Sequence, residues 1–250
     1  MRKRLPTDVL LQLKRWNTPT IYNGWEAITR HDRTKGWFNR EETRDFLPEA
    51  GPMVGYAVTV VFEPSNPEHT EIAGVSDRYL QYVAEQPGPK IVVVQDLDKP
   101  EVIGSFWGEV NAGFHSALGC VGTITDGAVR DVMEMNSIGF KALARRMCVG
   151  HAYSTPVRWG VPVEVFGCSI EPGSLIHADQ HGFLVIPEED EEKLLDAALF
   201  MDRNECETVI PAARMSSGKA TSDVLQDIRA AAAAFRTSAA HYFSRDTGEW

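Results

Sequence analysis

Two short, uninterrupted apolar runs constrain the fold of this 250-residue sequence more than any other feature: Lys90–Asp96 and Val121–Thr125. A strand that is apolar at nearly every position is typical of a sheet that is covered on both faces. Helical spacing between the two runs predicts a helix at about 109–118, with Gly119 as the residue that follows its C-cap. This strand–helix–strand order indicates a mixed α/β core.

Apolar periodicity and turn residues predict the remaining elements. The expected helices cover 7–16, 77–86, 130–137, 187–207 and 219–242, and the expected strands cover 52–63, 141–147, 163–170, 175–178 and 183–186. No pattern assigns residues 17–50. We therefore expect an N-terminal extension at 1–50, an α/β domain at 51–207 and a C-terminal helical tail at 208–250.

Composition excludes several classes of protein. Asp and Glu outnumber Lys and Arg by 35 to 25, a formal net charge of −10 that argues against binding to nucleic acid. The apolar runs are too short to cross a membrane, and no signal peptide is recognised, so a cytoplasmic location is expected. The four cysteines at 120, 148, 168 and 206 form no CxxC pair, which favours reduced thiols over a zinc ribbon or a redox motif.

Candidate functional residues lie on both sides of the second apolar run. Gly108, Glu109, Val110 and Asn111 stand at the start of the predicted helix, where free backbone N–H groups and the helix dipole favour an anion. The pair Arg130-Asp131 follows an expected Asp126-Gly127 turn at the end of the next strand. Ligands bind at that edge of open α/β sheets, so these groups are predicted to converge on one pocket.

These residue types suit one kind of chemistry. The planar fork of Arg130 matches a substrate carboxylate, and Asp131 offers a hard oxygen ligand to Mg²⁺ or Mn²⁺. A divalent ion beside a 2-keto acid stabilises a developing enolate, which cleavage of the adjacent C–C bond requires. From the residues alone, a structural ion pair or a helix cap stays the other open interpretation of Arg130-Asp131, and the pattern by itself favours it.

The spacing of these residues resembles a known family. Twenty residues separate Glu109 from Arg130-Asp131, as in the acid-x20-Arg-Asp motif of the regulator of ribonuclease activity A-like family. Its catalytic members are class II 4-hydroxy-4-methyl-2-oxoglutarate and 4-carboxy-4-hydroxy-2-oxoadipate aldolases. Further matching stretches are Val121–Gly127, Pro162–Gly167, Pro172–Asp179 and Gly182–Pro187. The resemblance implies a layered, swivelling β/β/α-type sandwich that assembles as a trimer or a dimer of trimers.

The resemblance also implies roles for individual residues. The amides of Gly108–Asn111 would bind the pyruvate-like part of a substrate, Arg130 would contact its carboxylate or keto oxygen, and Asp131 would ligate the metal. Glu109 stands where the family usually has Asp and would hold metal-bound water. Glu205 resembles the glutamate that a neighbouring subunit contributes to the family site. Ser174 replaces the acidic residue usual after Pro-Gly, which is expected to affect a turn.

The expected function is therefore a divalent-metal-dependent lyase. It would cleave a 4-hydroxy-2-oxo acid to pyruvate and a second keto acid, with oxaloacetate decarboxylation as a side activity. A protein-binding regulator of the same fold is the alternative, because the family also contains inhibitors of a ribonuclease.

Two weaker patterns are interpreted structurally. The alternating His177, Asp179 and His181 resemble a metal cluster but straddle an expected turn. His115, in the helix behind the Gly108 segment, is expected to be packed or exposed rather than catalytic. The tryptophans Trp25, Trp37, Trp107 and Trp159 are expected to supply aromatic surface for an interface.

Overall fold

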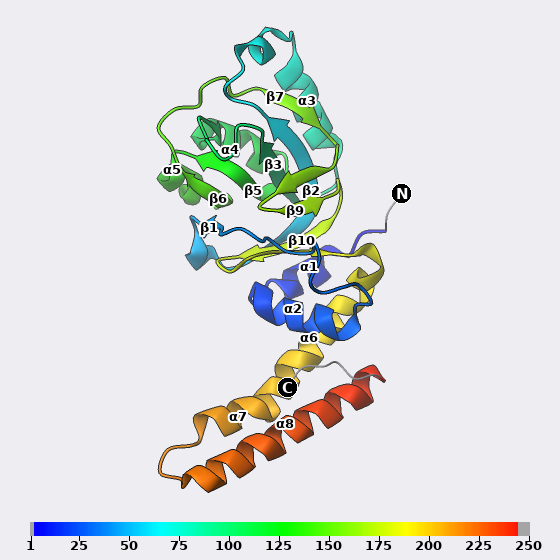
Figure 1. Ribbon diagram of the computed structural model, residues 1–250. Helices are drawn as coiled ribbons and strands as arrows, with labels where there is room; N and C mark the ends of the chain where they lie inside the picture. The colour runs from blue at the N-terminus through cyan, green and yellow to red at the C-terminus, as the bar shows by residue number, and fades with distance from the viewer. Residues whose placement is uncertain (1–2, 245–250) are drawn as a thin grey trace. The chain divides into compact units, whose positions relative to one another are not determined.

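The structure is a computed structural model that describes residues 3–244 (Figure 1). The outermost residues of the expected N-terminal extension and C-terminal tail, 1–2 and 245–250, lie outside the described range. The chain divides into two compact units. The first contains the chain up to Thr18 together with Thr34–Glu188, and the second contains Pro19–Arg33 and the chain from Glu189 onward.

One mixed sheet dominates the first unit. Within the described residues its strands follow the order β1-β6-β5-β3-β2-β10-β11, with β4 paired to β5 and β7 paired to β2. Strands β2, β3, β5 and β6 are mutually parallel, whereas β1, β7, β10 and β11 join antiparallel. The strands are β1 (Arg44–Asp45), β2 (Met53–Phe62), β3 (Lys90–Asp96), β4 (Ser105–Trp107), β5 (Cys120–Val129), β6 (Lys141–Met147), β7 (Pro156–Trp159), β10 (Leu175–Asp179) and β11 (Gly182–Ile186).

The sheet is covered on both faces, as the apolar runs predict. Ile91 and Val93 of β3 pack toward a small hairpin of β8 (Val163–Val165) and β9 (Cys168–Ile170). Their neighbours Val92 and Val94 belong to the core on the other face. That face carries the helices α3 (Val75–Glu85), α4 (Glu109–Ala117) and α5 (Val132–Ser137) (Figure 1). The layered α/β class expected from the sequence is therefore confirmed.

Several element boundaries differ from the predictions. Strand β5 does not end at an Asp126-Gly127 turn but continues through it, with an irregular register between Thr125 and Ala128. The single strand expected at 163–170 is wrong, because Phe166 and Gly167 adopt positive φ angles of 51° and 69° and turn the chain into the β8–β9 hairpin. The helix expected from residue 130 begins at Val132.

Other elements had no clear sequence signal. Strands β4 and β7 extend the sheet, and the short helices Pro48–Ala50 and Pro67–Glu71 belong to the same unit. The helix α1 (Thr7–Leu13), by contrast, matches the helix expected at 7–16. Segment 17–50, which no pattern assigned, contains α2 (Thr18–Ile28). Trp25 and Trp107 are both fully buried in the chain, so the expectation that they supply interface surface is wrong for these two.

Helices α2, α6 (Glu188–Glu207), α7 (Val209–Arg214) and α8 (Thr221–Phe243) form the second unit. Gly24 lets α2 approach α6 closely, since a Cβ there would lie 2.7 Å from the backbone nitrogen of Ala198. The indole N–H of Trp25 donates a 3.0 Å hydrogen bond to Asp190. Across the described residues, no helix combines the length and the apolar character that a membrane crossing needs.

Candidate active site

The site is built where two parallel strands end at the same edge of the sheet. Strand β4 ends at Trp107 and leads through Gly108 into α4, and its neighbour β5 ends at Val129 and leads into Arg130 and Asp131. The backbone N–H of Arg130 donates to the carbonyl of Trp107 at 3.3 Å, which ties the two strand exits together. The convergence expected from the sequence is thus present in the fold.

Gly108 allows the two segments to approach. It is the N-cap of α4 and has no side chain with which to cap the helix. Oδ2 of Asp131 takes this role instead, by accepting a hydrogen bond from the backbone N–H of Glu109 at 3.2 Å. A Cβ on Gly108 would lie 2.7 Å from the same oxygen, so any other residue here would force the Asp131 carboxylate to move. A carboxylate at the positive end of a helix dipole is electrostatically favourable.

Asp131 itself has a left-handed backbone, with φ 52° and ψ 42°, which is uncommon for a residue other than glycine. This conformation directs its carboxylate toward α4 rather than onto its own helix α5. Nε of Arg130 lies 3.6 Å from Oδ2 of Asp131. The ion pair and the helix cap considered for this pair are both present, and about a third of each side chain stays exposed to solvent.

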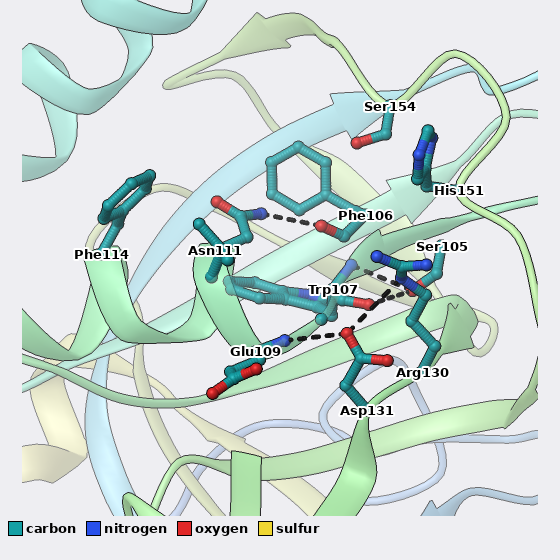
Figure 2. A pocket seen from close by; sticks show the side chains of 12 residues that line it. Ser105, Phe106, Trp107, Glu109, Asn111, Phe114, Arg130, Asp131, His151 and Ser154 are labelled. Atoms are coloured by element: carbon teal, nitrogen blue, oxygen red, sulfur yellow. Dashed lines mark hydrogen bonds and ion pairs between the residues drawn. The ribbon is translucent and has the colours of Figure 1, made fainter. Parts of the chain in front are cut away.

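These groups open on one cavity of about 340 Å³ (Figure 2). All of its lining residues come from the first unit. They are Ser105, Phe106, Trp107, Gly108, Glu109, Val110, Asn111, Phe114, Arg130, Asp131, His151 and Ser154. The structure therefore brings together six of the predicted site residues, from Gly108 to Asn111 and Arg130-Asp131, around a space large enough for a small organic acid.

Glu205, the seventh predicted residue, belongs to the second unit. It lies on α6, where its carboxylate accepts a 2.9 Å hydrogen bond from the side-chain amide of Asn23 on α2. Partial burial raises the pKa of Glu205, although the hydrogen bond from Asn23 opposes that change.

A buried pair holds α4 from behind the cavity. The Nδ1–H of His115 donates to the carbonyl of Asn111 at 2.7 Å, so Nε2 is left to accept from the hydroxyl of Tyr79 at 2.9 Å. Burial lowers the pKa of His115 to about 4, and the imidazole is therefore neutral at pH 7. Asn111 adds a hydrogen bond from its amide to the carbonyl of Phe106. Of the packed and exposed positions that the sequence left open for His115, the structure shows the packed one.

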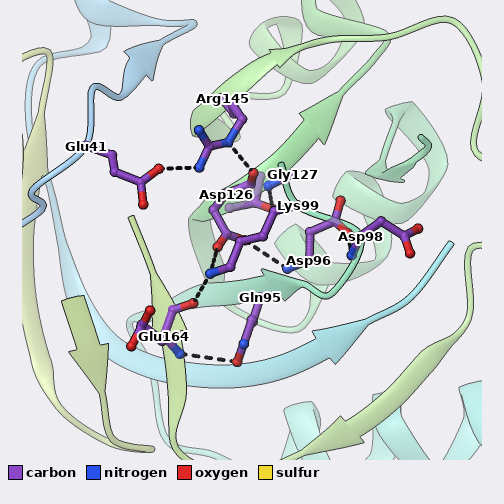
Figure 3. A network of polar contacts seen from close by, with 10 residues as sticks. Glu41, Gln95, Asp96, Asp98, Lys99, Asp126, Gly127, Arg145 and Glu164 are labelled. Carbon is purple, nitrogen blue, oxygen red and sulfur yellow. Dashed lines mark hydrogen bonds and ion pairs between the residues drawn. The ribbon is translucent and has the colours of Figure 1, made fainter. Parts of the chain in front are cut away.

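A second polar network holds the irregular part of β5 (Figure 3). The buried carboxylate of Asp126 accepts hydrogen bonds from the backbone of Asp96 at 2.8 Å and from the ammonium group of Lys99 at 2.6 Å. Arg145 donates to the Asp126 carbonyl. Oδ2 of Asp96 is buried without a hydrogen-bond partner among the described residues, and desolvation raises the pKa of Asp96 to about 6.

The donor set of the cavity fits a hard divalent cation that retains water. Asp131 and Glu109 supply carboxylate oxygens, and no cluster of three or more His, Cys, Asp or Glu side chains suitable for a metal occurs in residues 3–244. Mg²⁺ is commonly held by one or two carboxylates with several waters, whereas zinc prefers a closed set of nitrogen and sulfur ligands. Asp131 would hold such an ion directly, and Glu109 would hold its water.

The sequence did not single out the other lining residues. His151 and Ser154 come from the loop after β6, and Ser105, Phe106 and Phe114 flank the Gly108 segment.

His177 and Asp179, which alternate with His181 in the sequence, are buried in the first unit. His177 contacts the hydroxyl of Thr18 at 2.9 Å, and Asp179 accepts from the backbone of Thr18 and of His181, each at 2.8 Å.

Comparisons with known proteins place the chain in a family. The family model described as "RraA-like: Aldolase/RraA" matches residues 19–185, more than half of the chain, and the protein belongs to this RraA-like family. A protein from Halalkalibacterium halodurans named "Putative 4-hydroxy-4-methyl-2-oxoglutarate aldolase" is 28% identical over 168 residues, which cover 67% of this chain and 75% of that protein.

Solved structures show the same fold at lower sequence identity. An uncharacterized protein from Pseudomonas syringae pv. tomato has a TM-score of 0.68 and 20% identity, with 90% of this chain and 96% of that chain covered. Streptomyces coelicolor RraAS2, described as an unusual member of the RNase ES inhibitor RraA protein family, has a TM-score of 0.63 and 21% identity, with 82% and 96% covered.

Proposed function

We propose that this protein is a divalent-metal-dependent lyase that cleaves a 4-hydroxy-2-oxo di- or tricarboxylic acid into pyruvate and a second keto acid. One observation carries the proposal: Arg130, Asp131 and the N-terminal residues of α4 line a single cavity of about 340 Å³. The name of the Halalkalibacterium halodurans relative supports the same reaction class. Oxaloacetate decarboxylation is a proposed side activity, because it needs the same enolate of pyruvate.

Each group would have a separate task. The guanidinium group of Arg130 would bind the substrate carboxylate through its planar fork. The free backbone N–H groups at Val110 and Asn111 would bind the remaining anionic oxygen of the pyruvate-like part. Asp131 would hold Mg²⁺ or Mn²⁺, and Glu109 would orient water bound to that ion. When bound, the ion supplies positive charge that stabilises the negative charge developing on the 2-keto oxygen as the C–C bond breaks.

The activity test measures release of pyruvate. Purified protein is incubated with 4-hydroxy-4-methyl-2-oxoglutarate or with oxaloacetate, in Mg²⁺, in Mn²⁺ and in excess chelator, and pyruvate is followed through lactate dehydrogenase. We expect release with either metal, loss of release with chelator, and no release by the Arg130→Ala variant. The background decarboxylation that the free metal causes is subtracted with heat-denatured protein.

A protein-binding regulator is the second candidate, because Streptomyces coelicolor RraAS2 is described as a member of a ribonuclease-inhibitor family. The absence of metal-dependent pyruvate release from both substrates would favour that candidate. Under the lyase proposal the protein also works as a trimer or a dimer of trimers, in which Glu205 of one subunit completes the site of a neighbour.

A further inference from the structure

His151 lines the cavity but has no role in the mechanism above. It lies with Ser154 on one side of the cavity, while Glu109 and Asp131 lie on the other (Figure 2). The guanidinium group of Arg130 is near the same loop, since its Nη1 lies 3.5 Å from the carbonyl of Val149. The imidazole therefore belongs to the same space that the proposed substrate would fill.

Several backbone contacts hold the loop that carries His151. The N–H of Ser105 donates to the carbonyl of Gly150 at 3.1 Å, and the N–H of Tyr153 donates to Pro64 at 3.2 Å. The loop also packs tightly on Gly104, where a Cβ would lie 2.5 Å from the carbonyl oxygen of His151. These contacts fix the backbone of the loop before and after His151, so the histidine has a defined position at the side of the cavity.

One hydrogen bond determines which ring nitrogen of His151 is available as a base. Nδ1 of His151 lies 2.7 Å from the carbonyl oxygen of Ala152, and a carbonyl can only accept. Nδ1 therefore carries the proton, and Nε2 has the free lone pair. Ala152, whose carbonyl accepts this hydrogen bond, adopts a φ of 48°, a conformation that is uncommon for alanine. A histidine whose tautomer is set in this way is prepared to accept a proton at Nε2.

Aldol cleavage needs such a base, and the cavity offers few. Of the described residues that line it, Glu109 and Asp131 are assigned to the ion and its water, and Arg130 stays protonated. On the basis of the proposed lyase function, we propose that His151 is a catalytic residue whose Nε2 accepts the proton of the substrate's 4-hydroxyl group.

The step balances without any further reactant. The O–H bond at C4 breaks and its proton moves to Nε2, the C4–O bond becomes a carbonyl, and the C3–C4 bond breaks. The electron pair of that bond forms the enolate of pyruvate, which takes a proton from water at C3. The imidazolium then returns its proton to the hydroxide left by that water. Positioned general bases typically contribute about 10²–10⁴-fold to a rate.

This assignment separates two reactions of one site. Decarboxylation of oxaloacetate also yields pyruvate but involves no 4-hydroxyl proton, so it does not need His151. The informative variant is His151→Asn, because the asparagine amide can still donate to the Ala152 carbonyl whereas Nε2 is lost. His241→Asn, in α8 of the second unit, is the matched control.

The experiment measures kcat for both substrates in saturating Mn²⁺. We expect His151→Asn to lower cleavage of 4-hydroxy-4-methyl-2-oxoglutarate by about 10²-fold or more, to change decarboxylation far less, and His241→Asn to resemble the parent in both reactions. Added imidazole should restore part of the cleavage rate to His151→Ala, because a free base can enter the space left by the ring.

Two results would overturn the role of His151 without affecting the proposed lyase function. The first is unchanged cleavage by His151→Asn. The second is an equal loss in both reactions, which would assign His151 to binding of the keto-acid part that the two substrates share. The proposed lyase function fails in a different way, namely if the parent protein itself releases no pyruvate from either substrate in the presence of metal. That result would remove the role of His151 as well.

Discussion

The carboxylate of Asp131 caps the helix that begins at Glu109: its Oδ2 accepts the backbone N–H of Glu109 at 3.2 Å. The two residues come from different strand exits, so this hydrogen bond fixes the distance between the proposed metal ligand and the amide groups that would bind substrate. About a third of the Asp131 side chain stays exposed to solvent, so this hydrogen bond leaves part of the carboxylate accessible from the cavity.

Gly108→Ala should disturb this relationship directly. The new Cβ would lie 2.7 Å from Oδ2 of Asp131 and 3.2 Å from Nε of Arg130, and so the two side chains must move. We expect metal affinity and pyruvate release to fall about 10–100-fold, as is typical when groups that orient a metal ligand are lost. Calorimetric titration with Mn²⁺ measures the first effect and the coupled pyruvate assay measures the second.

Gly113→Ala is the matched control on the same helix. A Cβ there meets no atom within 4 Å, and alanine is favoured over glycine in a helix by about 1 kcal/mol. This variant should therefore unfold at a higher urea concentration and keep its activity. Equal activity of the two alanine variants would show that the contact between Gly108 and Asp131 does not matter for function.

Arg130→Lys should impair turnover although it preserves the charge. A lysine ammonium group is a point donor and cannot reproduce the two-pronged geometry of a guanidinium group. We expect kcat/KM for pyruvate release to fall by about 10²-fold or more. A kcat/KM close to that of the parent would mean that Arg130 is a structural partner of Asp131.

Asp96→Asn should stabilise the protein at pH 8 but not at pH 4. Burial raises the pKa of Asp96 to about 6, so the folded state favours the protonated carboxyl group. The stability contributed by this preference is present below the unfolded pKa of about 3.9 and is lost as the pH rises through about 6. Asparagine stays neutral throughout and avoids that loss.

Urea unfolding of parent and variant at the two pH values measures this effect. The difference in unfolding free energy between variant and parent should shift in favour of the variant by on the order of 2 kcal/mol from pH 4 to pH 8. An identical difference in unfolding free energy at both pH values would show that Asp96 titrates normally in the folded protein.

Mixing of subunits tests the proposed role of Glu205. The Arg130→Ala and Glu205→Ala proteins are each expected to be inactive, and under conditions of subunit exchange their mixture should regain part of the pyruvate release. Some interfaces would then contain an intact Arg130 and an intact Glu205 from a neighbour. If exchange is demonstrated by labelled subunits and no activity returns, Glu205 does not complete a neighbouring site.

The parts of the fold that the sequence predicts are those in which local pattern and burial agree. The run Lys90–Asp96 is apolar because alternate residues enter the cores on opposite faces of the sheet, and its limits match β3. Strand β5 continues beyond its predicted end because Lys99 and the backbone of Asp96 satisfy the buried Asp126 carboxylate. That support comes from distant residues, so the local sequence Asp126-Gly127 resembles a turn.

The candidate site divides in the same way. Gly108–Asn111 open a predicted helix and Arg130-Asp131 follow a predicted strand, so both segments are expected at one edge of the sheet. Strand β4, which leads into Gly108, has no signal of its own. His151 lies in a loop whose position depends on contacts with Gly104 and Pro64, which are far away in sequence. No local pattern carries that information, so the sequence alone does not place His151 at the site.

Binding of Mn²⁺ by Asp131→Asn is the measurement that tests the central claim most directly. The claim makes Asp131 the direct ligand, so removal of its charge from a hard-cation site should abolish detectable heat in a calorimetric titration. Glu109→Gln should bind Mn²⁺ with an affinity much closer to that of the parent and turn over slowly, whereas Glu109→Asp should stay active. If Asp131→Asn binds Mn²⁺ as tightly as the parent protein, the assignment of the ligand is wrong, and the mechanism built on it is contradicted.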